Sequence, residues 1–317
     1  MHNVLAADIG GTHFHVALFD SEGRRLLLSE GRTDASGGRE WMLGELRERV
    51  QDLMAKSDQP VRSCGISFGG PVDFRHQRVN SMHVTGWRGF RLGQWVEDNL
   101  SLECLVDNDA NAGALGEFRF GAGRGTESVL YLTISTGIGG GVVCGGRVHR
   151  GKDSMAGELG HIPVSDSGAV CSCGGRGCLE TVCSGIAIGL RGRGLARRKP
   201  EVMARTLELC SGNLEQITAE AVFRAAAEGE KGALFIVREA ARALARALLT
   251  AIRILNPDMI ILGGGVALSG PILLNPVREY LDEFSAPMLE CSTKVVQAEL
   301  GNYSPLYGAA ALAPELR

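Results

Sequence analysis

The sequence predicts an α/β fold of two lobes with a cleft between them. Short apolar runs alternate with stretches of helical periodicity, which is the pattern of alternating strands and helices. An order of strand, glycine-rich turn and strand occurs twice, first around residue 10 and again around residue 136, and it indicates an internal duplication. A chain of 317 residues also exceeds the usual size of one hydrophobic core, so two domains are expected.

The first lobe is expected to begin with a β-hairpin. Two apolar runs, Val4–Ile9 and His13–Phe19, flank a turn at Gly10–Thr12. Between Trp41 and Met54, leucine and valine residues recur at the spacing of an amphipathic helix. The other elements expected before residue 108 are strands at Leu26–Ser29, Cys64–Phe68 and Glu103–Val106 and a helix near Leu92–Leu100.

The second lobe repeats this opening after a helix at Ala110–Phe120. Strands at Val129–Ser135 and Ile138–Val143 flank a second turn, which is followed by a cysteine-rich insertion at His161–Glu180. Three helical stretches are expected next, and the clearest is an apolar stripe that ends before a proline. The remaining assignments are that helix at Ala233–Leu255, a buried strand at Met259–Leu262 that enters Gly263–Gly265, and a closing helix at Tyr307–Leu312.

The composition argues against several classes of function. The chain is 44% apolar and 22% charged with a net charge of −3, so it has no field that would attract nucleic acid or anionic lipid. The first residues lack a basic start and a long apolar run, and nowhere do eighteen apolar residues follow one another. Neither a signal peptide nor a membrane span is expected. Nine cysteines, an odd number in a large chain, fit the reduced cytosol and a metal site better than a disulfide framework.

Three glycine turns follow strands and are candidates for binding phosphate. The first, at Asp8–Thr12, offers bare backbone N–H groups and a hydroxyl beside a carboxylate, and Asp8 could position Mg²⁺ through water. The second is Ser135–Gly141 and the third is Gly263–Gly265. None has the spacing of a P-loop or of a Rossmann fingerprint. An ordinary tight hairpin is the alternative for any one turn, and it explains all three together less well.

The segment Asp107–Asp109 places carboxylates between the end of a strand and the start of a helix. A carboxylate there can remove the proton of an alcohol as a phosphoryl group is transferred to it. An Asp or Asn at such a boundary can equally be a helix N-cap. The residues alone leave Asp107 and Asp109 as equal candidates for the base.

A second cluster has the composition of a metal site. His161, Cys171, Cys173 and Cys178 lie within eighteen residues, and glycines between them permit tight folding around an ion. Three thiolates and one imidazole suit tetrahedral Zn²⁺, and four protein ligands leave no open position for a catalytic water. The sequence therefore predicts structural zinc, and unrelated thiols are the alternative. The second ring nitrogen of His161 would be left for another partner.

Six motifs together resemble the ROK family of sugar kinases and regulators, in the expected order over nearly the whole chain. They are DIGGT at Asp8–Thr12, DNDAN at Asp107–Asn111, STGIGGG at Ser135–Gly141, GELGH at Gly157–His161, CSCGGRGCLE at Cys171–Glu180 and LGGGV at Leu262–Val266. The resemblance implies the two-lobed actin/hexokinase-like (ribonuclease H-like) fold. It implies lobes of 1–108 with 304–317, and of 109–303 with the zinc-binding insertion at 157–180.

The resemblance also implies how ATP and the sugar bind. Asp109, which precedes Ala-Asn, becomes the base. The nucleotide with Mg²⁺ is assigned to Asp8, Gly10, Gly11, Thr12, Thr136, Gly137, Gly264 and Gly265. The sugar is assigned to Gly70, Asn108, Asp109, Glu158, His161, Glu180 and His83. Family members commonly carry asparagine at the place of His83, so this substitution puts the identity of the sugar in doubt.

The activity expected from the resemblance is ATP-dependent phosphorylation of the 6-hydroxyl of a hexose, with glucose first. N-acetylmannosamine or N-acetylglucosamine is the alternative substrate. The alternative of another class is a sugar-sensing ROK regulator without kinase activity, but the seven residues before Asp8 leave no room for the DNA-binding domain of such proteins. A homodimer is expected from the family and from base rates, and the expected location is the cytoplasm.

Overall fold

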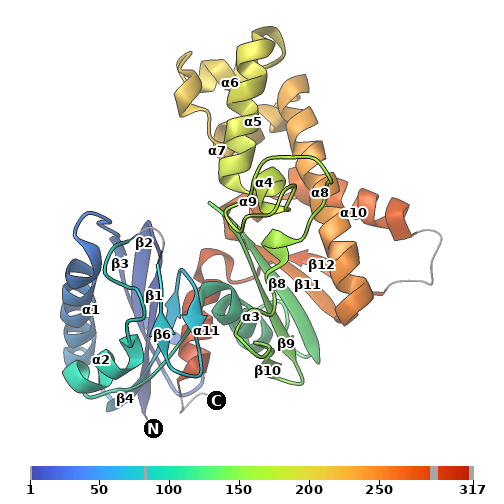
Figure 1. The fold of residues 1–317 in the computed structure, drawn as a ribbon. Helices are drawn as coiled ribbons and strands as arrows, with labels where there is room; N and C mark the ends of the chain where they lie inside the picture. Colours follow the sequence, from blue (N-terminus) through green and yellow to red (C-terminus); the bar gives the residue numbers. More distant parts are fainter. Residues whose placement is uncertain (1, 82–83, 286–291, 314–317) are drawn as a thin grey trace. The chain divides into compact units, whose positions relative to one another are not determined.

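The computed structural model describes residues 2–81, 84–285 and 292–313, and the predicted sugar contact His83 lies outside these ranges. The fold is mixed α/β (Figure 1). By its contacts the chain divides into two compact units. Unit 1 comprises Met1–Tyr131, Gly141–Ala156 and Asn302–Arg317, and unit 2 comprises Leu132–Gly140 and Gly157–Gly301.

The first sheet begins with the predicted hairpin, which is confirmed. Strands β1 (Asn3–Ile9) and β2 (His13–Phe19) pair antiparallel, and β2 pairs antiparallel with β3 (Arg25–Arg32). On its other side β1 pairs parallel with β4 (Val61–Phe68), which pairs parallel with β7 (Glu103–Asn108). The strand order is therefore β3-β2-β1-β4-β7. Because the carboxyl ends of β1, β4 and β7 lie at one edge, the residues after them gather there.

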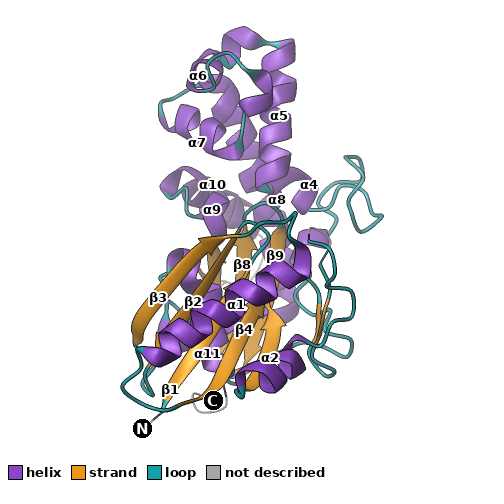
Figure 2. Ribbon diagram, turned by 90° about the vertical axis from the view of Figure 1, so that its left-hand side faces the viewer, coloured by secondary structure: helices purple, strands orange, loops and turns teal. Residues whose placement is uncertain are grey.

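Helices cover both faces of this sheet, as alternation along β1 requires. Leu5, Ala7 and Ile9 share a core with helices α1 (Gly38–Ala55) and α2 (Leu92–Leu100), and α1 crosses the strands in Figure 2. Ala6 faces the opposite way and packs against the C-terminal helix. That helix is α11 (Ser304–Leu312), and α3 (Asp109–Phe120) packs against it in turn.

Glycine allows α11 to approach its neighbours at backbone distance. A Cβ on Gly65 of β4 would lie 1.7 Å from the carbonyl oxygen of Ala309, and a Cβ on Gly308 would lie 1.7 Å from that of Ala112 in α3. Neither position can carry a side chain without movement of the backbone. These two contacts fix the C-terminal helix between the first sheet and the start of α3.

The second sheet repeats the order of the first, which confirms the predicted duplication. Its order is β10-β9-β8-β11-β12, with β10 paired antiparallel to β9 and β11 paired parallel to β12. The second glycine turn joins β8 to β9, as the first joins β1 to β2. The strands are β8 (Ser128–Ile134), β9 (Ile138–Cys144), β10 (Arg147–Val148), β11 (Met259–Gly263) and β12 (Lys294–Gln297), and a further small sheet pairs β5 (Val72–Asp73) with β6 (Arg78–Val79).

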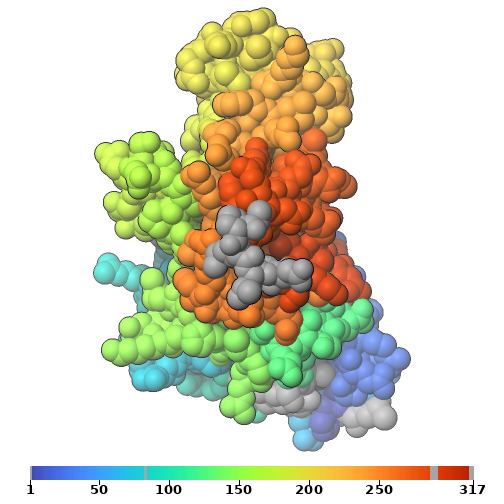
Figure 3. Space-filling view, turned by 90° about the vertical axis from the view of Figure 1, so that its right-hand side faces the viewer, coloured from blue at the N-terminus to red at the C-terminus, as the bar shows by residue number. Residues whose placement is uncertain are grey.

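Unit 2 holds more helices than the sequence predicted. Five α-helices, not three, lie between residues 180 and 255, because side-chain caps at Ser184 and Thr218 start separate helices. They are α4 (Glu180–Cys183), α5 (Gly185–Arg198), α6 (Ala204–Leu209), α7 (Ala219–Ala227) and α8 (Lys231–Leu255). Then come α9 (Gly264–Ala267) and α10 (Pro271–Ser285), which packs against α8. In Figure 3 the red-orange residues of α10 lie next to the orange residues of α8. Single 3₁₀ turns lie at Leu159–His161, Pro200–Val202, Leu214–Gln216 and Gly301–Tyr303.

The units differ from the predicted lobes in where residues 109–131 and 141–156 fall. Both segments belong to unit 1, because α3 packs closely on α11. A division by contacts does not locate a hinge, so the predicted lobe boundary after residue 108 stays a prediction. Among the described residues, no helix combines the length and the apolar character needed to cross a membrane.

Candidate active site

The first glycine turn is open to solvent, and hydrogen bonds to neighbouring residues hold its backbone. Gly11 and Thr12 are exposed, while the N–H of Gly10 donates to the carbonyl of His13 at 3.0 Å. Thr33 donates its hydroxyl to the carbonyl of Gly10 at 2.7 Å and its N–H to that of Thr12 at 2.9 Å. Asp8 precedes the turn, mostly buried. The turn can therefore present N–H groups and a hydroxyl to an anion without rearranging.

Two further loops of unit 1 meet this turn. The N–H of Gly69 donates to the carbonyl of Ile9 at 2.8 Å, which holds the end of β4 beside the turn. The amide nitrogen of Asn108 lies 3.4 Å from the carbonyl oxygen of Gly70. Asn108 also caps α3, since its oxygen accepts from the N–H groups of Ala110 and Asn111. Six predicted residues besides Asp8 are thus gathered at one edge of the first sheet: Gly10, Gly11, Thr12, Gly70, Asn108 and Asp109.

The two candidate bases, Asp107 and Asp109, have different surroundings. Asp107 is 1% exposed, and its Oδ2 accepts from Arg150 at 2.6 and 2.8 Å, while its Oδ1 accepts from the N–H of Asn108 and the amide of Asn111. Burial raises the pKa of Asp107, and the Arg150 guanidinium opposes that rise. Asp109 is half-buried in the first turn of α3, where its Oδ1 accepts from Ala110 N–H at 2.8 Å and from Asn108 at 2.9 Å.

The second glycine turn is held by a carboxylate from another element. Thr136 is exposed, and the N–H of Ile138 donates to Oε2 of Glu180 at 2.9 Å. A Cβ on Gly137 would lie 2.6 Å from the same oxygen, so glycine is needed for this approach. Glu180 begins α4, directly after the cysteine loop. The structure thereby brings the predicted residues Thr136, Gly137 and Glu180 together.

The remaining predicted residues of unit 2 lie around the ends of β8, β9 and β11. Gly264 has a φ of +81°, and a Cβ there would meet backbone atoms of Ile134 at 2.6 to 2.8 Å. Gly265 is exposed, with open space where a Cβ would be. The exposed carboxylate of Glu158 lies 3.8 Å from Nε2 of His161. These surfaces leave backbone groups accessible to a ligand.

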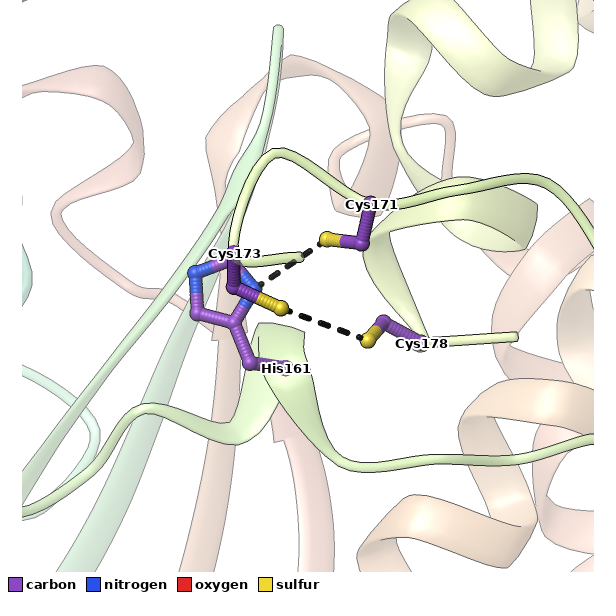
Figure 4. Close-up of side chains that lie close together, drawn as sticks. All are labelled: His161, Cys171, Cys173 and Cys178. Carbon is purple, nitrogen blue, oxygen red and sulfur yellow. Dashed lines mark hydrogen bonds between the residues drawn. The ribbon is translucent and has the colours of Figure 1, made fainter. Parts of the chain in front are cut away.

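The four predicted metal ligands form one cluster (Figure 4). The ligand atoms of His161, Cys171, Cys173 and Cys178 all lie within 4.8 Å of one another. Nδ1 of His161 is 3.4 Å from the sulfur of Cys171, and the sulfurs of Cys173 and Cys178 are 3.7 Å apart. Tetrahedral zinc with bonds of about 2.0–2.3 Å requires ligand separations of about 3.5–3.8 Å, which these pairs nearly match. Within the described part of the chain no other His/Cys/Asp/Glu group was found that could hold a metal.

Two residues that support the site were not predicted from the sequence. Ser67 is fully buried and donates its hydroxyl to Oδ1 of Asp8 at 2.7 Å. Arg150 forms the ion pair with Asp107 and lies 3.6 Å from the ring centroid of Phe74. Ser67 could have been found, because Asp8 and Ser67 end neighbouring strands in register. Arg150 follows a short strand that has no clear periodicity, so no comparable signal marked it.

Comparison with solved structures identifies the fold. A ROK family glucokinase from Streptomyces griseus, solved with glucose and AMPPNP, is 33% identical with a TM-score of 0.82, over 98% of this chain and 99% of that one. A ROK hexokinase from Thermus thermophilus is 32% identical with a TM-score of 0.81, over 98% and 97%. The protein therefore has the two-domain, actin-like ATPase fold of sugar kinases, as predicted.

The sequence comparisons agree. The ROK family matches residues 4–316. A glucokinase from Thermotoga maritima is 34% identical over 313 residues, which cover 98% of this chain and 97% of that protein. This chain belongs to the ROK family.

Proposed function

We propose that this chain is an ATP-dependent glucokinase that transfers the γ-phosphoryl group to the 6-hydroxyl of glucose. Full-length relatives of this name at 32–34% identity support the activity, and the Streptomyces griseus structure contains glucose and an ATP analogue. The observation on this chain that carries the proposal is the contrast between Asp107 and Asp109. Asp107 is sealed in an ion pair, whereas Asp109 stands half-buried at the start of a helix.

In this proposal Asp109 accepts the proton of the 6-hydroxyl as the phosphorus–oxygen bond forms. Asp107 is 1% exposed and both of its oxygens already accept hydrogen bonds from Arg150, Asn108 and Asn111, so no oxygen of Asp107 is placed to meet a substrate hydroxyl. Asn108 would hold a ring hydroxyl beside Asp109, to which it donates. Gly70, Glu158, His161 and Glu180 complete the proposed sugar contacts, as does His83, which lies outside the described residues.

ATP is assigned to the glycine turns. Gly11 and Thr12 would bind phosphate oxygens through exposed N–H groups and a hydroxyl, while Gly10, whose N–H already donates to His13, would let the phosphate approach the turn closely. Thr136 with Gly137 would bind phosphate from the second turn. Gly264 and Gly265 would lie against adenosine, where the absence of side chains permits close approach. Asp8 would hold Mg²⁺ through water, and Mg²⁺ would neutralise the transferred charge.

Structural zinc is the second part of the proposal. Two separations in the cluster support it, because 3.4 Å between the His161 nitrogen and the Cys171 sulfur and 3.7 Å between the Cys173 and Cys178 sulfurs are close to those of a tetrahedral site. Burial raises the pKa of Cys178 to about 12, and a bound cation is what would keep this sulfur as a thiolate. Zinc would fix the loop that leads into Glu180. A cytoplasmic location follows from the proposal, because these thiols must remain reduced.

The activity is tested by measuring ADP formation from ATP with a panel of sugars. The panel contains glucose, mannose, N-acetylmannosamine and N-acetylglucosamine. Glucose-dependent ADP formation with the highest kcat/KM of the panel is expected. Preference for an N-acetyl sugar would favour the alternative substrate, and sugar binding without ADP formation would favour a regulator without kinase activity. Light scattering on the same samples tests the proposed homodimer.

A further inference from the structure

One histidine of the first sheet has a ring nitrogen with an unusual environment. His15 is 16% exposed, and its Nδ1 is buried without a hydrogen-bond partner among the described residues. This nitrogen lies 3.6 Å from Oδ2 of Asp8, and Nε2 lies 3.5 Å from Oε1 of Glu30. Both separations exceed a hydrogen bond. The imidazole therefore stands between two carboxylates, and one of them is the proposed Mg²⁺ residue.

The sheet register dictates this arrangement. His15 of β2 is the direct partner of Asp8 on β1 and of Glu30 on β3, so the three side chains lie in one row on one face. Cβ atoms of such antiparallel partners are about 4.5–5.5 Å apart, which places their polar ends within mutual reach. The three strands run side by side in Figure 2. A row of two acids around a histidine is thus built into the sheet.

The surrounding residues fix both ends of the row. Ser67 holds Oδ1 of Asp8 at 2.7 Å, so the contact with His15 falls on the other carboxylate oxygen. Tyr303 donates its hydroxyl to Glu30 at 2.9 Å, and its ring lies edge-on to His15 with centroids 5.6 Å apart. The bond to Glu30 raises the pKa of Tyr303, so Tyr303 stays a neutral donor. Arg25 lies 4.5 Å from the Tyr303 ring centroid.

We propose that His15 is a positioning residue for the nucleotide site, which orients the Asp8 carboxylate through Nδ1 and thereby sets the affinity for Mg²⁺-nucleotide. Ser67 restrains only one oxygen of Asp8, and a small rotation brings Nδ1 into hydrogen-bonding range of the other, at about 2.7–3.2 Å. Glu30 and the ring of Tyr303 contact the imidazole on the side away from Asp8. Partners of this kind behind a metal-binding carboxylate change metal affinity by about 10- to 100-fold. The inference rests on the proposed nucleotide site.

Calorimetry with AMPPNP, with and without Mg²⁺, tests this role on the folded protein. His15→Leu is expected to weaken binding of Mg²⁺-AMPPNP by about 10- to 100-fold, with little effect on metal-free AMPPNP or on glucose. His15→Gln keeps an N–H donor and should restore most of the affinity. His76→Leu is the matched control, because His76 contacts Asp73 at 2.7 Å instead of Asp8.

The outcomes separate this inference from the proposed function. If the unaltered protein binds Mg²⁺-AMPPNP and His15→Leu binds it equally well, the inference is wrong and the nucleotide site stands. Equal losses with and without Mg²⁺ would also overturn the positioning role. If the unaltered protein binds no nucleotide, both fail. Should His15→Leu not fold, Glu30→Gln, which removes the charge behind the imidazole, replaces it, with a several-fold loss expected only with Mg²⁺; no loss would overturn the inference.

Discussion

The two glycine turns of the duplicated hairpins occupy equivalent places in sheets of the same strand order, but different elements support them. The turn at Gly10–Thr12 follows Asp8 and is supported by hydrogen bonds from Thr33, which comes directly after strand β3. The turn that contains Thr136 follows Thr133 where the first has an acid, and it is held by Glu180 from beyond the cysteine loop. Duplication has kept the topology, while the acidic groups of the proposed phosphoryl transfer are concentrated in unit 1.

This difference predicts that the two units respond differently to the loss of an acidic side chain and to the loss of metal. The site residues of unit 1 rest on strand ends, on α3 and on the glycine contacts of α11. The turn of unit 2 is held by Glu180, which follows the loop that carries the proposed metal ligands. Changes that spare the backbone but remove an acid should affect chemistry in unit 1. Loss of metal should affect the structure of unit 2.

The largest effect is expected for Asp109→Asn. It removes the proposed base, and kcat should fall by about 10²- to 10⁴-fold while glucose still binds. Steady-state kinetics and glucose titration measure the two quantities. Asp98→Asn, at an exposed position of α2, is the control and should retain the original kcat. Near-normal turnover of Asp109→Asn would show that Asp109 is not the catalytic base.

Metal loss comes next. Cys178→Ser should reduce the zinc content from about one ion per chain to near zero and lower the melting temperature. Hydrogen exchange should increase in the cysteine loop and around Glu180, with the first sheet unchanged. Cys144→Ser, at an exposed cysteine outside the cluster, should keep its zinc. Equal exchange in both units would contradict the separate dependence of unit 2 on the metal.

The stability of unit 1 is expected to depend on the close contact between α11 and α3. Gly308→Ala places a Cβ 1.7 Å from the carbonyl oxygen of Ala112, and it should lower the free energy of unfolding by about 1–3 kcal/mol. Gly44→Ala in α1 has open space around the new methyl group and should be neutral or stabilising by up to about 1 kcal/mol. Urea unfolding compares the two. Similar free energies of unfolding for the two variants would mean that the contact between α11 and α3 has room for a side chain at residue 308.

The smallest effect is expected at the second turn itself. Glu180→Gln keeps an oxygen that can accept from Ile138 and removes only the charge, so KM for ATP should change by a few-fold. Glu180→Ala leaves the Ile138 N–H without this acceptor and should have a larger effect on the same constant. If both variants have the original kinetics, Glu180 does not support the turn.

Much of the fold could be predicted from local pattern. The alternation in Val4–Ile9 and His13–Phe19 and the apolar stripe of α8 identify elements whose bounds differ from the structure by at most two residues. The short helices α4 and α6 were not separated, because four to six residues are too few for a helical period to appear. The tight approach of Gly308 to α3 depends on a partner about 200 residues away, which no local pattern encodes.

Part of the candidate site could likewise be predicted from local sequence, and part could not. The proposed metal ligands lie close in sequence, so spacing alone predicted that they form a cluster. The choice between Asp107 and Asp109 could not be made from neighbouring residues, because it depends on the buried contact with Arg150. The row of Asp8, His15 and Glu30 required the register of three strands.

The central claim is that the protein transfers phosphate from ATP to the 6-hydroxyl of glucose. Phosphorus NMR of a reaction with ATP and carbon-13-labelled glucose tests this directly, because coupling to carbon 6 locates the new ester. The account predicts glucose 6-phosphate and ADP in equal amounts from the unaltered protein, and almost none from Asp109→Asn. Free phosphate without a sugar ester, or an ester at another carbon, would contradict it.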